Sequence, residues 1–278
     1  MKQRIVIKLG GSALQNTETM QQLAVLIRGY QKRRYSVIVV HGGGPAINAQ
    51  LNKQGITWKF IEGQRQTTPE MMTVIDQVLA VDVNSMLVEN LNMLHIPAVG
   101  LSGAKNKILT CSQTNVELQQ VGTVEAVNPA AIEFVLAQFR TRVPVIAPIG
   151  IDSNGVKYNV NADWAATKIA IALGAKKLIF LTDQKGILNE KQKLLAKVSI
   201  PMMDAMMDEG IIYGGMSTKV KAMIYAVQAG IKYVRVMHAS FAAELVSDTV
   251  SDITIGTLLT RQRAQSQPEV EVLNGKAG

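Results

Sequence analysis

The stretch "IVIKLGGSAL" (residues 5–14) joins a short apolar run to a lysine and a pair of glycines. The run has the length and the β-branched side chains of a buried strand. Lys8 stands near its end, and at Gly10 and Gly11 the missing Cβ lets backbone N–H groups approach an anion. Two interpretations are open here: a solvent-facing lysine before an ordinary turn, or a phosphate site in which Lys8 supplies the charge.

Strand-like runs of this kind alternate with helical patterns along the rest of the chain. Strands are predicted at 4–9, 36–41, 96–101, 144–150, 177–183 and 233–238, and helices at 17–33, 46–55, 67–95, 129–139, 161–175, 202–212 and 217–230. This alternation is typical of an α/β fold with a parallel sheet. Residues 107–128 alternate in polarity instead and are expected to form an antiparallel hairpin.

A domain boundary is predicted near Gly174, where a second strand–loop–helix series begins. It divides the chain into an N-terminal lobe, 1–174, and a C-terminal lobe, 175–260. Residues 261–278 show no apolar periodicity, so we expect them to form a mobile tail.

Composition narrows the class of protein. The chain has 278 residues, of which 47% are hydrophobic and 18% charged, enough to bury a large globular core. No apolar run reaches ~18 residues and the N-terminus lacks a signal-peptide pattern, so we expect neither a membrane span nor export. A single cysteine, Cys111, excludes an intramolecular disulfide and a cysteine-based metal site. We therefore expect a cytoplasmic protein.

The net charge of +8 favours small anionic ligands. Aromatic residues make up only 5% of the chain, and no basic block is interleaved with them. Nucleic-acid binding usually needs both features, so we expect no nucleic-acid partner.

A glycine-rich motif, "HGGGPAIN" (41–48), follows the second predicted strand and opens a helix. Its glycines can point backbone amides at an anion bound to the helix N-terminus. The motif fits neither the P-loop nor the dinucleotide-binding fingerprint, and a turn without a ligand is the open alternative. His41 is expected to be a packed strand-end residue rather than a base.

Two further segments carry polar side chains that a ligand could use. Arg65 stands before a predicted helix, where it could grip a carboxylate or merely solvate a loop. Asn159, Asn161 and Asp163 occupy alternate positions, which in an extended segment point to one side. The alternative is an asparagine-rich helix start capped by Asn161.

Two later motifs, in the second half of the chain, could also bind an anion. "LIFLTDQKGIL" (178–188) ends a predicted strand with Thr182 and Asp183, and ligands bind beyond such strand ends. "GGMSTKVKAM" (214–223) places Lys219 in the expected first turn of a helix. A lysine there opposes the helix dipole, which suits an anion better than it suits stability.

Taken together, these segments resemble the amino acid kinase family, and within it the branch that phosphorylates N-acetyl-L-glutamate. The motifs "KLGGS", "HGGGP", "GQR", "NVNAD", "LTD..GIL" and "GGM..K" stand in the family's order over nearly the whole chain. Two positions depart from it: the "RQTT" segment, and Ser217-Thr218 where Ile-Pro is commoner. The resemblance implies a three-layer αβα sandwich with a mainly parallel central sheet.

The resemblance also implies an activity: ATP-dependent phosphorylation of the γ-carboxylate of N-acetyl-L-glutamate, a step toward arginine. The N-terminal lobe would bind the acyl amino acid and the C-terminal lobe the ATP, with Mg²⁺ held mainly by the nucleotide phosphates and no protein metal site. A γ-carboxylate is already ionised at neutral pH, so the reaction needs positioning and charge rather than a general base.

The resemblance assigns roles residue by residue. Lys8, Lys219, Asp163, Gly11 and Gly44 would act in phosphoryl transfer, with Asp163 holding both lysines. The acyl amino acid would contact Gly43, Gly44, Arg65 and Asn159. The nucleotide would contact Gly11, Asp183, Gln184, Lys185, Gly186, Ile187, Leu188, Ile211, Ile212 and Tyr213.

Three rival functions stay open. One is a family member acting on a related carboxylate, such as protein-bound aminoadipate, glutamate or aspartate. Another is a non-catalytic amino-acid sensor on the same fold, which should have lost Lys8, Asp163 or Lys219. A nucleoside monophosphate kinase of this fold is disfavoured by "NVNAD" together with the Arg65 loop.

Assembly is the last expectation. The resemblance implies that arginine-inhibited hexamers of the family carry an extra helix before the first strand. In this chain the first strand is expected to begin by Arg4. The predicted helix 67–95 carries apolar side chains that could bury a two-fold interface. The candidates are Met71, Val74, Val78, Val81 and Met86. We therefore expect a homodimer that arginine does not inhibit.

Overall fold

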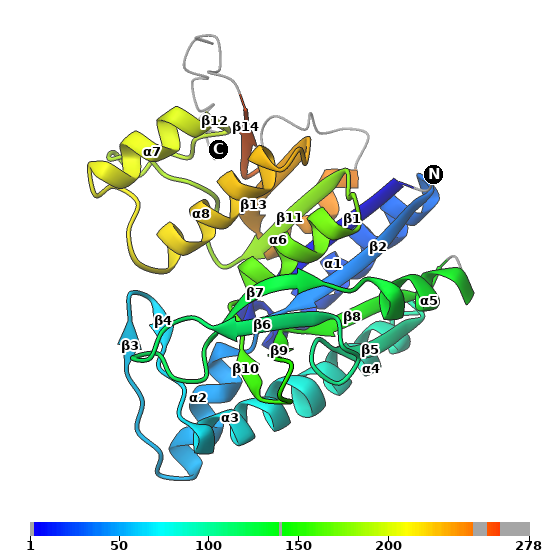
Figure 1. The fold of residues 1–278 in the computed structure, drawn as a ribbon. Helices are drawn as coiled ribbons and strands as arrows, with labels where there is room; N and C mark the ends of the chain where they lie inside the picture. Colours follow the sequence, from blue (N-terminus) through cyan, green and yellow to red (C-terminus); the bar gives the residue numbers. More distant parts are fainter. Residues whose placement is uncertain (1–2, 139–140, 247–254, 262–278) are drawn as a thin grey trace.

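A computed structural model describes residues 3–138, 141–246 and 255–261. Its centre is an eight-stranded sheet of order β12-β14-β13-β11-β1-β2-β8-β5 (Figure 1). The strands are β1 (Gln3–Leu9), β2 (Tyr35–His41), β5 (Ala98–Ser102), β8 (Val143–Ala147), β11 (Lys177–Thr182), β12 (Lys197–Ser199), β13 (Tyr233–His238) and β14 (Thr257–Thr260). All neighbours pair in parallel except β13 and β14. The predicted α/β class with a mainly parallel sheet is confirmed.

Helices cover both faces of this sheet because its strands are apolar on both sides. One face packs against α1 (Thr17–Lys32), α2 (Gly44–Lys53), α3 (Pro69–Asp76), α4 (Asn84–Met93) and η3 (Ala239–Val246). The other packs against α5 (Ala130–Gln138), α6 (Ala162–Ala172), α7 (Ile200–Asp208) and α8 (Gly214–Gln228). In β1, Ile5, Ile7 and Leu9 join the first core and Val6 the second. Lys8 therefore faces the α6 side, since strand side chains alternate.

The predicted helix 67–95 is a continuous helix interrupted by a π-helical segment, η2 (Gln77–Val83), between α3 and α4. Thr68 caps its start, accepting a hydrogen bond from the Met71 amide at 3.2 Å. By length and composition alone, Pro69–Met93 is the one helix in the described chain that could cross a membrane. Half of its most apolar window is buried inside the molecule, as in a core helix.

The same helix offers less of an interface than the sequence predicts. Met71, Val74 and Val78 are buried in the core of this chain. Val81 and Met86 are 48% and 37% exposed, so only these two of the five predicted positions are open to a partner.

A smaller sheet, of order β10-β9-β6-β7, lies between α6 and α3, contacting α6 through β7 and α3 through β10 (Figure 1). The predicted hairpin is present as the antiparallel pair β6 (Leu109–Gln113) and β7 (Gly122–Val127). The predicted strand 144–150 divides at Pro148, and its second part becomes β9 (Ile149–Ile151), paired with β10 (Lys157–Asn159).

A short hairpin, β3 (Phe60–Ile61) and β4 (Gln64–Arg65), lies between α2 and α3 and was not predicted. Its two-residue turn has φ of 49° at Glu62 and 77° at Gly63, as the twist of a tight hairpin requires. The predicted tail, apart from Arg261, lies outside the described residues. The lobe division near Gly174 stays a prediction, since β1 pairs directly with β11.

Candidate active site

Three loops meet where the parallel strands β1, β2 and β11 end. Gly10 N donates to Leu181 O at 2.9 Å, and Gly42 N donates to Leu9 O at 2.8 Å. These bonds fix the glycine turns that follow β1 and β2 beside the end of β11. The carboxyl edge of a parallel sheet is where such folds bind ligands.

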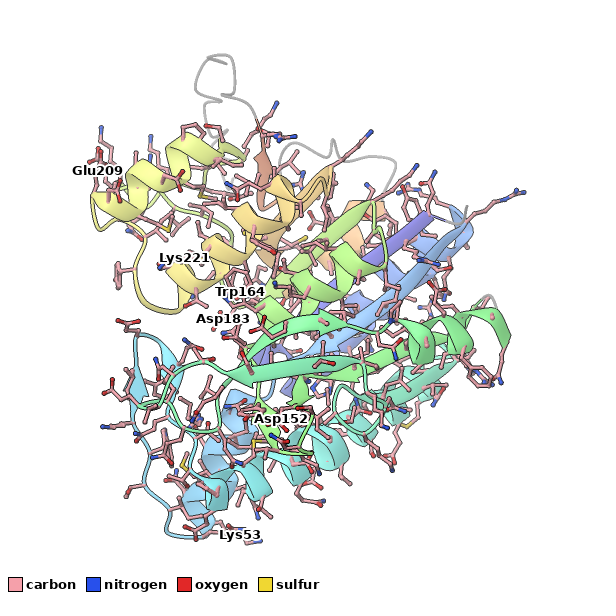
Figure 2. All side chains as sticks on the ribbon, in the orientation of Figure 1. Lys53, Asp152, Trp164, Asp183, Glu209 and Lys221 are labelled. Atoms are coloured by element: carbon pink, nitrogen blue, oxygen red, sulfur yellow. The ribbon has the colours of Figure 1, made fainter. Side chains whose placement is uncertain are left out.

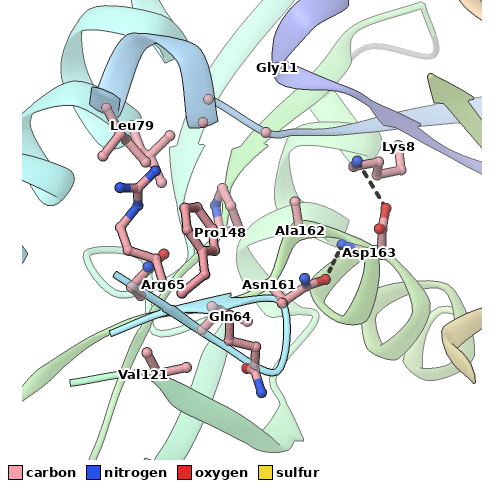
Figure 3. Close-up of a pocket in the computed structure, with 18 residues that line it drawn as sticks. Lys8, Gly11, Gln64, Arg65, Leu79, Val121, Pro148, Asn161, Ala162 and Asp163 are labelled. Carbon is pink, nitrogen blue, oxygen red and sulfur yellow. Dashed lines mark hydrogen bonds and ion pairs between the residues drawn. The ribbon is translucent and has the colours of Figure 1, made fainter. Parts of the chain in front are cut away.

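A buried charge triad, Lys8–Asp163–Lys219, lies at this edge. Figure 3 shows its Lys8–Asp163 ion pair. Lys8 Nζ pairs with Asp163 Oδ1 at 2.9 Å, and Lys219 Nζ donates to Asp163 Oδ2 at 2.8 Å. All three side chains are only 9–10% exposed. Two ammonium groups share one carboxylate, so the triad keeps one positive charge that a bound anion could neutralise.

The pKa of Asp163 reflects this competition. Burial by itself would raise the pKa of this carboxyl, but the two ammonium groups outweigh burial and lower the pKa to about 2. Burial lowers the pKa of Lys219, and Lys8 lowers it further, whereas Asp163 and Asp183 oppose the shift. The first turn of α6 also favours a negative charge at Asp163 through the helix dipole.

Helix α8 begins at Gly214, three residues before the predicted start. Lys219 therefore lies in the second turn, and the predicted position in the first turn is wrong. The hydrogen bond to Asp163 offsets its cost of burial, to which the positive dipole end at the start of α8 makes no favourable contribution.

The glycine turns bring bare amides together. A Cβ at Gly11 would lie 2.9 Å from the backbone N atoms of Gly43 and Gly44. Among the described residues, the amides of Gly11, Gly43 and Gly44 have no acceptor. Gly43 and Gly44 also open helix α2, whose positive dipole end adds to the attraction for an anion.

Arg65 is buried, at 7% exposure, which excludes the role of a loop-solvating arginine. Its Nη2 donates to Asn48 Oδ1, and its Nη1 has no hydrogen-bond partner in the described chain. Burial lowers the pKa of Arg65 to about 10, so the guanidinium keeps its charge at neutral pH. A buried cationic donor without a partner is costly and points to an anionic ligand.

The "NVNAD" segment serves both interpretations given to it. Asn161 caps α6, accepting from the amides of Asp163 at 2.9 Å and Trp164 at 3.2 Å. Asn159 Nδ2 instead donates to Thr67 Oγ1 at 3.1 Å.

A first cavity of about 240 Å³ lies between these groups (Figure 3). It brings together Lys8, Gly11, Gly43, Gly44, Arg65, Asn159 and Asp163 of the predicted site, and adds Gly42, Ile47, Phe60, Gly63, Gln64, Leu79, Val121, Pro148, Val160, Asn161 and Ala162. Its charged groups stand at two ends, Arg65 at one and the triad at the other. Sequence reasoning missed the apolar residues because each reads as an ordinary core position.

A second cavity, of about 500 Å³, lies on the other side of the triad. Eight residues of the predicted nucleotide site line it: Asp183, Gln184, Gly186, Ile187, Leu188, Ile211, Ile212 and Tyr213. The rest of the lining is Thr182, Asn189, Gln192, Gly215, Met216 and Lys219, which was predicted to act in phosphoryl transfer. Lys185 is absent from this lining, and Gly11 lines the first cavity instead. Lys8 and Asp163 face one cavity and Lys219 the other, so the triad stands between the two.

His41 lies fully buried behind the glycine loop, as predicted. Its Nδ1 is 2.9 Å from Gly42 O and its Nε2 is 3.0 Å from Asn84 Nδ2. Burial lowers the pKa of His41 to about 4, despite the contact with Gly42 O, which raises it. The ring is neutral at pH 7, with Nδ1–H donating to Gly42 O and Nε2 accepting from Asn84.

Comparison with known sequences agrees with this geometry. Residues 3–238 match the amino acid kinase family. The acetylglutamate kinase of Methanococcus aeolicus is 34% identical over 273 residues, 93% of this chain and 92% of that protein. The acetylglutamate kinase of Caldanaerobacter subterraneus subsp. tengcongensis is 37% identical over 265 residues, 93% of this chain and 87% of that protein.

Solved structures share the fold. The structure of smu.665 from Streptococcus mutans UA159 aligns with a TM-score of 0.81 at 29% identity, covering 94% of this chain and 100% of that one. Carbamate kinase from Giardia lamblia bound to AMP-PNP aligns with a TM-score of 0.66 at 18% identity, covering 94% of this chain and 99% of that one. The second likeness shows the fold alone.

Proposed function

Because the chain belongs to the amino acid kinase family, we propose that it transfers the γ-phosphoryl group of ATP to the γ-carboxylate of N-acetyl-L-glutamate. The products are ADP and N-acetyl-L-glutamyl 5-phosphate, on the route to arginine. The curated acetylglutamate kinases that match more than nine-tenths of this chain support this substrate. The observation that carries the proposal is the triad of Lys8, Asp163 and Lys219 standing between two cavities.

The first cavity suits the acyl amino acid. Its two cationic ends match a substrate with two carboxylates: Arg65 for the one that stays unmodified and Lys8 for the one that is phosphorylated. Gly43, Gly44 and Asn159 supply further donors beside Arg65. The γ-carboxyl has an ordinary pKa of about 4.3, so it is ionised at neutral pH and attacks without a general base.

The reaction is a displacement at the γ-phosphorus of ATP. A γ-carboxylate oxygen forms the new P–O bond while the bond to the β-phosphate oxygen breaks and ADP leaves with that electron pair. Lys8 and Lys219, with the amides of Gly11 and Gly44, stabilise the charge on the transferring oxygens. Asp163 holds the two ammonium groups close together, where they would otherwise repel each other.

The second cavity suits ATP. Its volume is about twice that of the first, and it mixes apolar residues for a base with polar groups for a ribose and phosphates. Gly11, Asp183 to Leu188, and Ile211 to Tyr213 form the proposed nucleotide site, although Lys185 does not line the cavity. Mg²⁺ would reach the site on the ATP phosphates and neutralise part of their charge.

We also propose that the protein is a cytoplasmic homodimer. Val81, Met86 and Met93, on the solvent side of the helix Pro69–Met93, are 48%, 37% and 70% exposed. A two-fold interface would bury such side chains against their own copies. Light scattering coupled to size exclusion tests this, and a monomeric mass would contradict it.

A substrate panel tests the central proposal and its rivals together. The purified chain is incubated with ATP, Mg²⁺ and hydroxylamine, which converts an acyl phosphate into a coloured hydroxamate. N-Acetyl-L-glutamate should give product, and L-glutamate, L-aspartate and L-α-aminoadipate should give little. Strong product with one of the three amino acids favours that amino acid as the substrate. No product with any of the four compounds favours a non-catalytic sensor or a kinase of protein-bound aminoadipate.

A further inference from the structure

The short hairpin β3–β4 brings three side chains to one side. Phe60 and Arg65 are direct antiparallel partners, and the backbone bond from Gln66 N to Lys59 O at 3.1 Å continues the ladder. Directly opposed residues present their side chains on the same face. Trp58 stands two residues before Phe60 and so shares that face.

The rings lie close to the cation. The Arg65 Cζ atom is 5.1 Å from the Trp58 ring centroid and 4.9 Å from the Phe60 ring centroid. Both distances are within the ~6 Å range of a cation–π contact. Because Arg65 is buried, water competes poorly with these rings.

The remaining contacts of the guanidinium leave one donor open. Asn48 Oδ1 accepts from Nη2, whereas Nη1 has no hydrogen-bond partner among the described residues. No Asp or Glu of the described chain forms a salt bridge with Arg65, although other cations in it do form ion pairs, such as Arg4 with Glu133 and Lys157 with Asp76. Aromatic faces stabilise the positive charge and leave the N–H donors of the guanidinium free, whereas a carboxylate partner would occupy them.

We propose that Trp58 and Phe60 are positioning residues that hold the Arg65 guanidinium, with Nη1 directed to the substrate carboxylate that is not phosphorylated. The proposal rests on the function proposed above and adds a determinant of substrate affinity. Phe60 lines the first cavity together with Arg65, so the hairpin presents the ring and the cation to the same ligand.

A plain apolar lid is the competing explanation, and the choice of substitutions separates the two. Phe60→Leu keeps apolar bulk but removes the π face, whereas Phe60→Tyr keeps the face. Trp58→Leu and Trp58→Phe make the same pair of changes at the second ring. Phe134→Leu is the matched control, because Phe134 on α5 is 64% exposed, Phe60 is 57% exposed, and Phe134 lines neither cavity.

The measurement is calorimetric titration of each full-length variant with N-acetyl-L-glutamate and, separately, with ATP, alongside both KM values. Each leucine variant should weaken acetylglutamate binding about fivefold, the loss of one cation–π contact. ATP binding and kcat should stay within about twofold. The variants that keep a ring, and Phe134→Leu, should bind like wild type.

A double-mutant cycle shows whether the rings act through Arg65. In an Arg65→Met background, Phe60→Leu should cost no further affinity, because no cation remains to position. An equal loss in both backgrounds, or leucine variants that bind like wild type, would overturn the ring proposal alone. Wild-type protein that binds no acetylglutamate would overturn the proposed function and this role of the rings with it.

Discussion

Lys219 on helix α8 donates a 2.8 Å hydrogen bond to Asp163 at the start of helix α6. The second oxygen of the same carboxylate pairs with Lys8 at the end of strand β1. One buried carboxylate thus joins three elements and the two cavities beside them (Figure 2 shows the surrounding side chains). The proposed phosphoryl transfer depends on that junction.

Acid should weaken the contribution of Asp163 to stability. The folded pKa of about 2 lies below the ordinary value of 3.8, so this contribution is present above pH 4 and is lost as the pH falls toward 2. The difference in unfolding free energy between wild type and Asp163→Asn should therefore be largest above pH 4 and smaller at pH 3. Urea denaturation at pH 7, 4 and 3 measures this difference. Asp208→Asn is the control, because Asp208 is an exposed residue of α7.

Mild acid should also lower the free energy of unfolding through His41. Its folded pKa of about 4 lies below the ordinary 6.5, so the unfolded state binds the proton first and stability falls as the pH drops below 6.5. Between pH 7 and 5 this should cost about 2 kcal/mol of unfolding free energy. The loss should disappear in His41→Gln and persist in His95→Asn. An unchanged slope in His41→Gln would assign the pH dependence to another group.

Arg65→Lys should separate the two substrates. The lysine keeps the charge but loses the planar fork that grips a carboxylate, so the KM for acetylglutamate should rise by about tenfold or more. The KM for ATP should hardly change, because Arg65 lines only the first cavity. Steady-state kinetics with each substrate varied decides this. Equal effects on both KM values would place Arg65 outside the acyl site.

Gly11→Ala should impair turnover through the backbone. The added methyl group would lie 2.9 Å from two amide nitrogens and 3.0 Å from Pro45 Cδ, so the two glycine turns must move apart and displace the amides proposed to bind the phosphoryl group. We expect kcat to fall by about 10²-fold, the scale of losing a preorganised donor. Ser12→Ala, at the exposed next position, should keep wild-type activity. A Gly11→Ala enzyme with normal kcat would show that this turn makes no contribution.

Much of this site was predictable because strand ends and glycine turns leave strong local signals. Lys8 beside Gly10 and Gly11 predicts an anion site at a strand end. In the structure Lys8 does lie at the carboxyl edge of the parallel sheet, near the end of β1. Asn159, Asn161 and Asp163 do line one cavity, but not through the alternation of an extended segment, because Val160 and Ala162 line it as well and Asp163 lies in α6. The ordered set of motifs then located Lys219, which no local pattern could have paired with Lys8.

The misses have physical causes. Strands β12 and β14 have 3 and 4 residues, too short for a periodicity to register. The β3–β4 hairpin is equally short, although Glu62-Gly63 was a usable turn signal. Pro148 lies inside one apolar run, and the sequence alone does not reveal that its two parts join different sheets.

The most direct test of the account is the turnover of Lys8→Met and Lys219→Met in the hydroxamate assay. Both substitutions keep most of the length of the side chain and remove the charge proposed to act on the transferring phosphoryl group. The account predicts a fall in kcat of about 10²–10³ for each variant. Calorimetry should show acetylglutamate and ATP binding within about tenfold of wild type. Near-normal turnover by either variant would contradict the assignment of the triad to phosphoryl transfer.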